Sequence, residues 1–175
     1  MRLLTLLLAI VIAVAACSAP PREPEKPANP LAGRTNEYIC DANIICGELE
    51  MSVSITRRNP QSCTVEFTAP DTLEGILLTF IEDSMDMSYL GLEFSVKSTS
   101  LPSAMPVALV LSVLNRAAAD NGVTVTESAE NIILSGNIHD GAFELLLDKA
   151  SKHVLSLAIP EYNLTANFEG LAFAD

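Results

Sequence analysis

Apolar and polar residues alternate along three successive segments between residues 38 and 68, and a period of two is typical of half-buried antiparallel strands. The apolar residues of these segments share one face, with mostly polar residues opposite. They are Tyr38, Cys40, Ala42 and Ile44 in the first segment, Leu49, Met51, Val53 and Ile55 in the second, and Cys63, Val65 and Phe67 in the third. We therefore expect a sheet with one buried face.

The residues between these segments predict a register. A tight turn at 47–48 places Ile44 opposite Met51 and Cys40 opposite Ile55, so that all four side chains point to the same face.

A short loop at 58–60 places Ile55 opposite Cys63 and Val53 opposite Val65. Because Cα spacing between neighbouring strands is about 5 Å, Cys40 and Cys63 would then lie roughly 9–10 Å apart, too far for a disulfide.

Further short apolar segments, bounded by Gly, Pro, Asn, Asp or Ser, predict more strands. These are Ile76–Glu82, Met87–Val96, Val123–Glu127, Asn131–Gly136, Ala142–Asp148, Val154–Ile159 and Asn163–Phe168. Several are apolar on both faces, which indicates that both sides are covered.

One helix is expected between the two groups of strands. Ser103 can cap its start, Pro106 suits its first turn, and 121–122 (Asn-Gly) can end it. Its apolar stripe consists of Val107, Val110, Leu111 and Leu114. A helix this apolar and too short to span a membrane belongs inside a fold, and a sheet that wraps around it would supply that position.

The first residues have the pattern of a secretory signal. Arg2 precedes an apolar stretch from Leu3 to Ala16, which is shorter than the roughly 20 residues that span a membrane. Its end, Val14-Ala15-Ala16-Cys17, resembles the lipobox of bacterial lipoproteins, in which the cysteine is lipidated and the peptide is cut before it. The alternative is an ordinary signal with an incidental cysteine.

This resemblance divides the chain into a signal at 1–16, a lipidated Cys17 with a tether at 17–36, and one domain at 37–175. The tether is rich in proline between residues 20 and 30 and has no apolar period, so we expect none of it to be buried. The expected location is the extracytoplasmic face of a cell membrane, or the outer membrane in a Gram-negative cell.

The charge of the domain restricts its partners. From residue 37 onward there are 20 acidic and 6 basic residues, a net charge of −14. Nucleic acid is excluded as a partner because phosphate contacts need clustered Lys and Arg. The same charge disfavours contact with anionic lipid, so the membrane should hold the domain by its anchor alone.

Three cysteines, Cys40, Cys46 and Cys63, follow Cys17. An odd number permits at most one disulfide among them. The predicted register favours three free and mostly buried thiols, and a single disulfide stays the alternative.

The stretch Phe67-Thr-Ala-Pro70-Asp-Thr-Leu73-Glu-Gly75-Ile76 is similar to the LolA-like family of lipoprotein carriers, which includes LppX-type domains. The strand order toward the end of the chain is similar as well. The resemblance implies an α+β fold, in which an incomplete antiparallel barrel, a strongly curved sheet of about eight to ten strands, wraps around one main helix and leaves an apolar cavity. The chain departs from the carriers in its expected anchor and in having one good helix.

Residues suited to catalysis or metal binding do not form a recognisable motif. His139 and His153 lie in expected turns, and the acidic residues at 82–86 lack the spacing of a calcium loop. We therefore expect no enzyme activity, no catalytic residues, no metal and no cofactor.

Two functions remain open. One is the binding of a lipid chain or another apolar ligand in the curved sheet. The alternative is an anchored module with a closed core that docks an envelope protein or enzyme. The candidate cavity-lining residues are Met51, Val53, Phe67, Leu78, Phe80, Leu92, Phe94 and Leu111.

Overall fold

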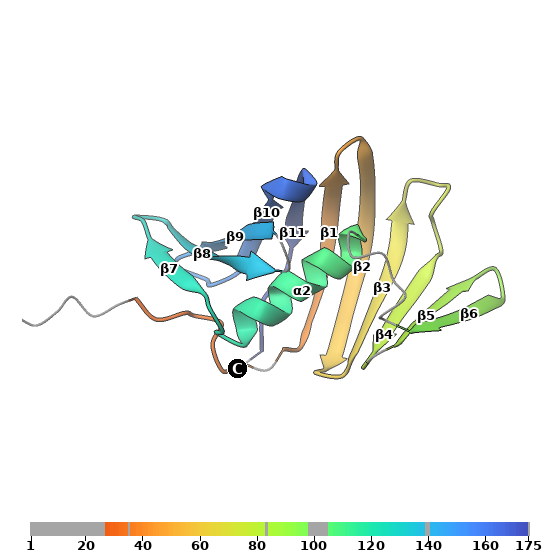
Figure 1. The fold of residues 1–175 in the computed structure, drawn as a ribbon, viewed down its shortest axis with the longest axis horizontal. Helices are drawn as coiled ribbons and strands as arrows, with labels where there is room; N and C mark the ends of the chain where they lie inside the picture. Colours follow the sequence, from red (N-terminus) through yellow and green to blue (C-terminus); the bar gives the residue numbers. More distant parts are fainter. Residues whose placement is uncertain (1–26, 35, 83, 98–104, 139–140, 175) are drawn as a thin grey trace, which may run out of the picture.

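The computed structural model describes residues 27–34, 36–82, 84–97, 105–138 and 141–174. In this part of the chain, eleven strands form one antiparallel sheet in the order β6-β5-β4-β3-β2-β1-β11-β10-β9-β8-β7 (Figure 1). The strands are β1 (Tyr38–Cys46), β2 (Leu49–Asn59), β3 (Ser62–Ala69), β4 (Leu77–Ile81), β5 (Ser84–Tyr89), β6 (Leu92–Lys97), β7 (Thr124–Glu127), β8 (Asn131–Ile138), β9 (Gly141–Asp148), β10 (Val154–Ile159) and β11 (Leu164–Glu169).

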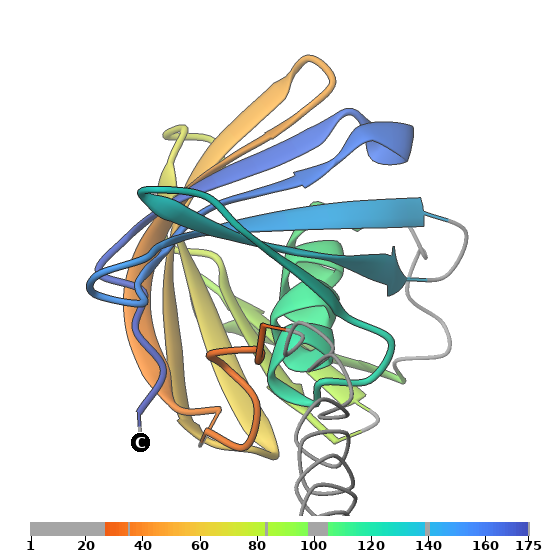
Figure 2. The ribbon, with the colours of Figure 1, turned by 90° about the vertical axis from the view of Figure 1, so that its left-hand side faces the viewer.

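The sheet is an unclosed barrel around one helix. β1 pairs with β11 in its middle, which leaves β6 and β7 as the two edges. The chain crosses from one edge to the other through α2 (Pro106–Ala118), and the sheet curves around this helix (Figure 2). A short 3-10 helix, η2 (Pro160–Tyr162), precedes β11. The expected incomplete antiparallel barrel is confirmed, with eleven strands in the described residues.

The first predicted register is confirmed. Ile44 lies opposite Met51 and Cys40 lies opposite Ile55 in the β1–β2 hairpin. Gly47 has the left-handed backbone conformation (φ 61°) that a tight turn needs. Glycine adopts this conformation readily, so the residue type at this position already indicated the turn.

The second predicted register is wrong by two residues. Ile55 lies opposite Val65 and Val53 opposite Phe67, because β2 continues to Asn59 and pairs there with Ser62. The turn is therefore shorter than the expected loop. A shift of two residues keeps every side chain on its predicted face, since the side-chain period of a strand is two.

The expected single strand Met87–Val96 is also wrong, because the chain turns back within it. Leu90 and Gly91 both have positive φ angles, 49° and 82°, as the central residues of a type I′ hairpin turn require. The result is the β5–β6 hairpin, in which Tyr89 lies opposite Leu92.

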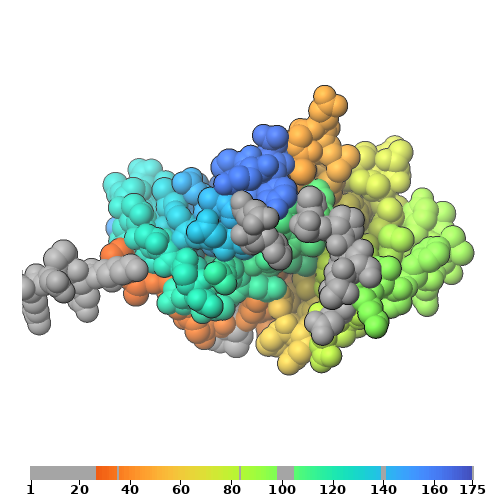
Figure 3. All heavy atoms as spheres, in the orientation of Figure 1, coloured from red at the N-terminus to blue at the C-terminus, as the bar shows by residue number. Residues whose placement is uncertain are grey.

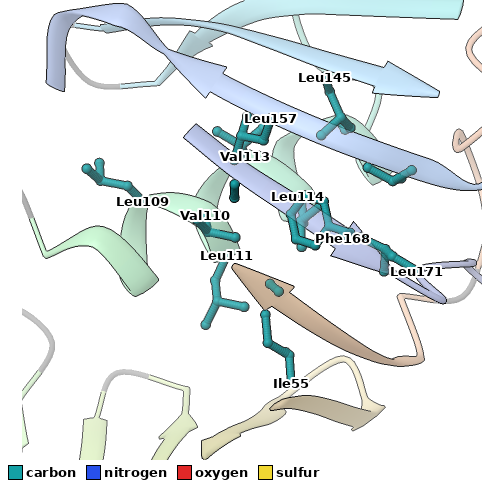
Figure 4. Packing of buried hydrophobic residues seen from close by; sticks show 14 of the residues in the cluster. Ile55, Leu109, Val110, Leu111, Val113, Leu114, Leu145, Leu157, Phe168 and Leu171 are labelled. Carbon is teal, nitrogen blue, oxygen red and sulfur yellow. The ribbon is translucent and has the colours of Figure 1, made fainter. Parts of the chain in front are cut away.

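Helix α2 packs on the concave side of the sheet. Its buried residues are Val107, Leu109, Val110, Leu111, Val113, Leu114 and Ala117. Leu111 lies on the side facing Ile55, and Leu114 lies beside Phe168 (Figure 4). Pro106 occupies the first turn as predicted; Met105 precedes it as N-cap without a side-chain hydrogen bond, and Ser103 lies outside the described residues.

The expectation that nothing before residue 37 is buried is wrong. Leu31 is 0 % exposed and Asn29 is 9 % exposed. The Asn29 side chain donates hydrogen bonds to the Ala117 carbonyl (2.7 Å) and to Asp120 Oδ1 (2.9 Å), at the end of α2. The packed part of the chain therefore begins before residue 37. Cys17 lies outside the described residues, and its lipidation stays a prediction.

Cys40, Cys46 and Cys63 are free thiols in the structure, as favoured from the register. Among the helices described, none combines the length and apolar character that crossing a membrane requires.

Candidate functional site

One row of register partners runs across the concave face from the centre of the sheet to its β6 edge. It consists of Ile55, Val65, Leu78, Met87 and Phe94, each directly opposite the next on the neighbouring strand. Directly opposed residues point to the same face of a sheet. The exposed fraction is 0 % for Ile55 and 2 % for Leu78, but 55 % for Phe94. The apolar concave face therefore opens to solvent at β6.

We call the exposed end of this surface the open apolar face. It consists of Phe80 on β4, Met87 and Tyr89 on β5, and Leu92, Phe94 and Val96 on β6. Leu92 is 60 % exposed and Val96 is 39 % exposed, whereas Phe80, Met87 and Tyr89 are half-buried. Six aligned apolar side chains make a continuous patch of the kind that marks a binding surface.

The position of α2 explains why this end is uncovered. The most extensive helix–sheet contacts join α2 to β8 and β1. The β5–β6 hairpin lies at the other end of the sheet, beyond the helix (Figure 1), and forms the green end of the space-filling view (Figure 3). The helix therefore closes the core at the centre but not at β6.

The residues predicted to line a cavity all lie on the concave side, but in two different environments. Met51, Val53, Phe67, Leu78 and Leu111 are buried in the core, Phe80 is half-buried against it, and Leu92 and Phe94 are exposed on β6.

Sequence reasoning missed Met87, Tyr89 and Val96, because the hairpin turn at Leu90–Gly91 was read as part of one strand. The signal in the sequence was Gly91, because a glycine inside a strand pattern indicates a bulge or a turn.

A hollow of about 450 Å³ also lies over β4–β6. Its lining residues are Leu77, Thr79, Asp86, Met87, Ser88, Glu93, Phe94 and Ser95. By register, Met87 and Phe94 belong to the open apolar face, and the other six belong to the opposite face. This lining contains two carboxylates and no cationic side chain, so it disfavours an anionic group.

A second hollow, of about 420 Å³, lies where the segment before β1 meets the connection from α2 to β7. Pro27, Asn29, Asp120 and Val125 are among its lining residues. Asn29 uses its side chain for hydrogen bonds within the protein. The hollow therefore marks a packing junction.

Among the residues that the structure describes, the buried cation Arg57 joins the sheet to the helix. Arg57 is 8 % exposed, and its guanidinium donates to Asn115 Oδ1 and to the Pro60 carbonyl, both at 2.5 Å. Asn115 Oδ1 also accepts a hydrogen bond from Asn36 Nδ2 (2.7 Å). These contacts tie the β2–β3 turn and the start of β1 to α2, which is a structural role.

Burial makes two of the thiols unreactive. Desolvation raises the pKa of Cys40 to about 12 and that of Cys63 to about 11. Desolvation also raises the pKa of the neighbouring Tyr38 hydroxyl. Because the thiolate is the reactive form of cysteine, neither thiol is a nucleophile near neutral pH.

Two local groups of titratable residues outside the core lie at strand ends and turns. Glu127 and Lys149 form an exposed ion pair (2.8 Å), and Asp148 accepts hydrogen bonds from Ser151 at 2.6 Å. His153 lies in the turn before β10, and His139 lies outside the described residues. Within the described ranges, no three His, Cys, Asp or Glu side chains come together as metal ligands.

Comparison with known proteins gives a structural match and no sequence match. No family model matches the chain, and no curated protein matches it. Among solved structures, the chain is similar to the crystal structure of the LolA superfamily protein NE2245 from Nitrosomonas europaea. The two have 7 % sequence identity and a TM-score of 0.41, and the match covers 83 % of this chain and 90 % of that chain.

Proposed function

We propose that this protein is a lipid-anchored, extracytoplasmic module that binds an apolar chain on its open apolar face. The observation that supports the proposal is the rise in exposed fraction along one apolar row, from 0 % at Ile55 to 55 % at Phe94. Solvent-exposed apolar side chains in an aligned row are costly for a protein to maintain without an occupant. Burying each large apolar side chain fully is worth about 1.5–3 kcal/mol.

The charge around the face favours a neutral ligand. Glu93 and Asp86 lie on the other face of the same strands, and the chain from residue 37 onward has a net charge of −14. A fatty acid or anionic phospholipid would approach against this field, whereas the acyl chain of a neutral lipid would not. A neutral acyl lipid is therefore the proposed ligand class.

The proposed anchor is Cys17, at the end of the Val14-Ala15-Ala16 signal. Asn29, whose side chain binds the end of α2, stands twelve positions further along the chain. An extended proline-rich segment of that length reaches roughly 37 Å. The tether would hold the domain close enough to a membrane to exchange a lipid with it.

The test is ligand binding by the chain from residue 17 onward with Cys17→Ser, which removes the acyl group but keeps the segment packed on α2. The probe is a fluorescent neutral monoacylglycerol, used below its micelle concentration, with the free dye as control. We expect saturable binding by this protein and loss of binding in Phe94→Asn.

The matched control is Leu90→Asn in the turn of the same hairpin, where Leu90 is 85 % exposed but stands outside the face. It should bind like the parent protein. Equal binding by both variants, or no binding by the parent protein, would contradict the proposal.

A second function is favoured by one further observation. β6 is an edge strand whose six residues are all exposed. An exposed edge can accept a strand from another protein, so docking of an envelope protein is the alternative. A parent protein that binds no monoacylglycerol but protects β6 amides from hydrogen exchange when a partner is added would favour it.

A further inference from the structure

The β5–β6 hairpin determines which backbone groups face the free edge. Tyr89 and Leu92 flank its two-residue turn and lie opposite each other. Such flanking residues form a hydrogen-bonded pair, and hydrogen-bonded positions then alternate along the strand. Leu92, Phe94 and Val96 therefore direct their N–H and C=O groups toward β5. Glu93, Ser95 and Lys97 direct theirs outward.

We propose that a second copy of this chain pairs with β6 in antiparallel orientation, with Ser95 opposite Ser95 of the second copy. In an antiparallel pair of identical strands, outward-directed positions must face one another. The symmetric register can therefore centre on an outward residue (Glu93, Ser95 or Lys97) or on an inward residue such as Phe94, which places Glu93 opposite Ser95. Centring on Glu93 or on Lys97 places two like charges directly opposite, which is destabilising. Centring on an inward residue avoids this conflict but leaves Glu93 and Lys97 without an opposite charge facing them. Centring on Ser95 is the register that avoids the conflict and places Glu93 opposite Lys97.

The Ser95 register also pairs opposite charges twice. It places Glu93 of each copy opposite Lys97 of the other. Within its own hairpin, Glu93 lies opposite Ser88 and Lys97 lies opposite Ser84, so neither charge faces an opposite charge across β5. The free edge of β6 is thus complementary to itself.

The same register brings apolar side chains together. Phe94 would lie opposite Val96 of the second copy, twice. Because the two-fold axis would run perpendicular to the sheet, the two open apolar faces would lie on the same side. Pairing would cover part of Phe94 and Val96, which are 55 % and 39 % exposed. The proposed dimer depends on backbone hydrogen bonds between the two β6 strands and on the charge pairs, and it does not require the proposed lipid.

The other edge strand fits this role less well. β7 (Thr124–Glu127) has four residues, and Glu127 already pairs with Lys149. Pairing β6 with itself gives a closed dimer, whereas pairing β6 with β7 would give an open chain of copies.

The test is analytical ultracentrifugation of the chain from residue 17 onward with Cys17→Ser, over a wide range of concentration. We expect a monomer–dimer equilibrium. Glu93→Lys and Lys97→Glu, each of which makes the facing charges alike at both pairs, should each weaken the dimer by about tenfold. Glu66→Lys makes the same charge change on an exposed position of β3 and should leave the dimer unchanged.

Mixing the two charge variants separates pairing from any effect of charge on folding. The mixture pairs opposite charges at both positions and should recover the affinity of the parent dimer, as should the double variant Glu93→Lys/Lys97→Glu. A monomer at every concentration, larger open assemblies, or a mixture as weak as its components would overturn the proposal.

Ser95→Pro gives a separate test of the backbone. Proline removes one outward N–H and is tolerated in edge strands, so the variant should keep its melting temperature and lose the dimer. A folded Ser95→Pro variant that still dimerises would also overturn the proposal. The monoacylglycerol measurement above reports on the lipid independently, because the charge variants keep Phe94 and its apolar neighbours.

Discussion

Asn29 and Ala117 are 88 residues apart in the chain, yet the Asn29 amide donates a 2.7 Å hydrogen bond to the Ala117 carbonyl in the last turn of α2. That carbonyl lies at the helix end, where it also accepts the Asp120 backbone N–H (3.3 Å). The segment that follows the proposed anchor therefore first contacts the domain at the end of α2.

Asn29→Ala should lower the free energy of unfolding by about 1–3 kcal/mol, because it removes the two side-chain hydrogen bonds from Asn29 to Ala117 and Asp120 at the end of α2. Chemical denaturation measures the change. Asn43→Ala removes an exposed side-chain hydrogen bond to Glu50 and should change stability by less than about 0.5 kcal/mol. Similar losses of stability in both variants would contradict a larger contribution from the buried Asn29 hydrogen bonds.

Leu111→Asp should unfold the domain, because it places an unpaired carboxylate where the side chain is 5 % exposed. Ser112→Asp, at the half-buried neighbouring position on the same helix, should leave a folded protein. Circular dichroism during heating measures both. A cooperative melt of Leu111→Asp at the parent temperature would mean that α2 is not part of the core.

The three thiols should react with iodoacetamide in a definite order. Cys46 is half-buried and donates a weak hydrogen bond to the Tyr162 carbonyl (3.5 Å), whereas Cys40 and Cys63 are each 4 % exposed. In the native protein at neutral pH we expect Cys46 to be modified first. Peptide mass spectrometry identifies the site, and denaturant should make all three react. Early modification of Cys63 would contradict the assigned burial.

Stability should fall as the pH rises above about 9. In the folded state burial raises the pKa of Cys40 to about 12 and that of Cys63 to about 11, from an ordinary value of 9.0. Above pH 9 the unfolded chain therefore loses these protons while the folded chain keeps them, which favours unfolding. The loss continues until the pH passes the folded values.

Denaturation curves at pH 8 and pH 10 measure this dependence. The variant Cys40→Ala/Cys63→Ala should show a smaller decrease between the two values, although it is less stable at pH 8. Return to pH 7 before denaturation should restore the parent stability. An unchanged pH dependence in the double variant would assign the effect to other groups.

Cys17→Ala should release the full-length protein from membranes or leave its signal uncleaved, because the proposed lipid attaches at this sulfur. Fractionation and intact mass measure the outcome. Ser18→Ala is the matched control and should stay in the membrane fraction with an acylated mass. Membrane retention of a normally processed Cys17→Ala protein would contradict the anchor.

The alternation of residues predicted the buried face of β1 to β3, and this was the part of the fold that local chemistry determines. The two-residue error at Ile55 and Val65 arose because a turn at Pro60–Gln61 and a longer loop have the same polar composition. The error did not change the face, since the period of a strand tolerates a shift by two. The buried face of a strand is therefore easier to predict than the residue that lies opposite on the neighbouring strand.

The candidate site was predicted in part. Leu92 and Phe94 were named from their apolar character, together with Met51 and Val53, which lie in the core. All four residues are apolar and lie in strands, and their hydrophobicity does not determine which other part of the chain covers each side chain.

By itself the sequence determined a curved antiparallel sheet around one apolar helix, because strand and helix periods depend only on neighbouring residues. The tertiary structure decided where the helix lies along the sheet. That position leaves Phe94 exposed while Ile55, in the same row, is covered. It also brought Leu31, from a proline-rich segment without apolar period, into the core. Both outcomes depend on contacts between residues far apart in the chain, which local pattern does not encode.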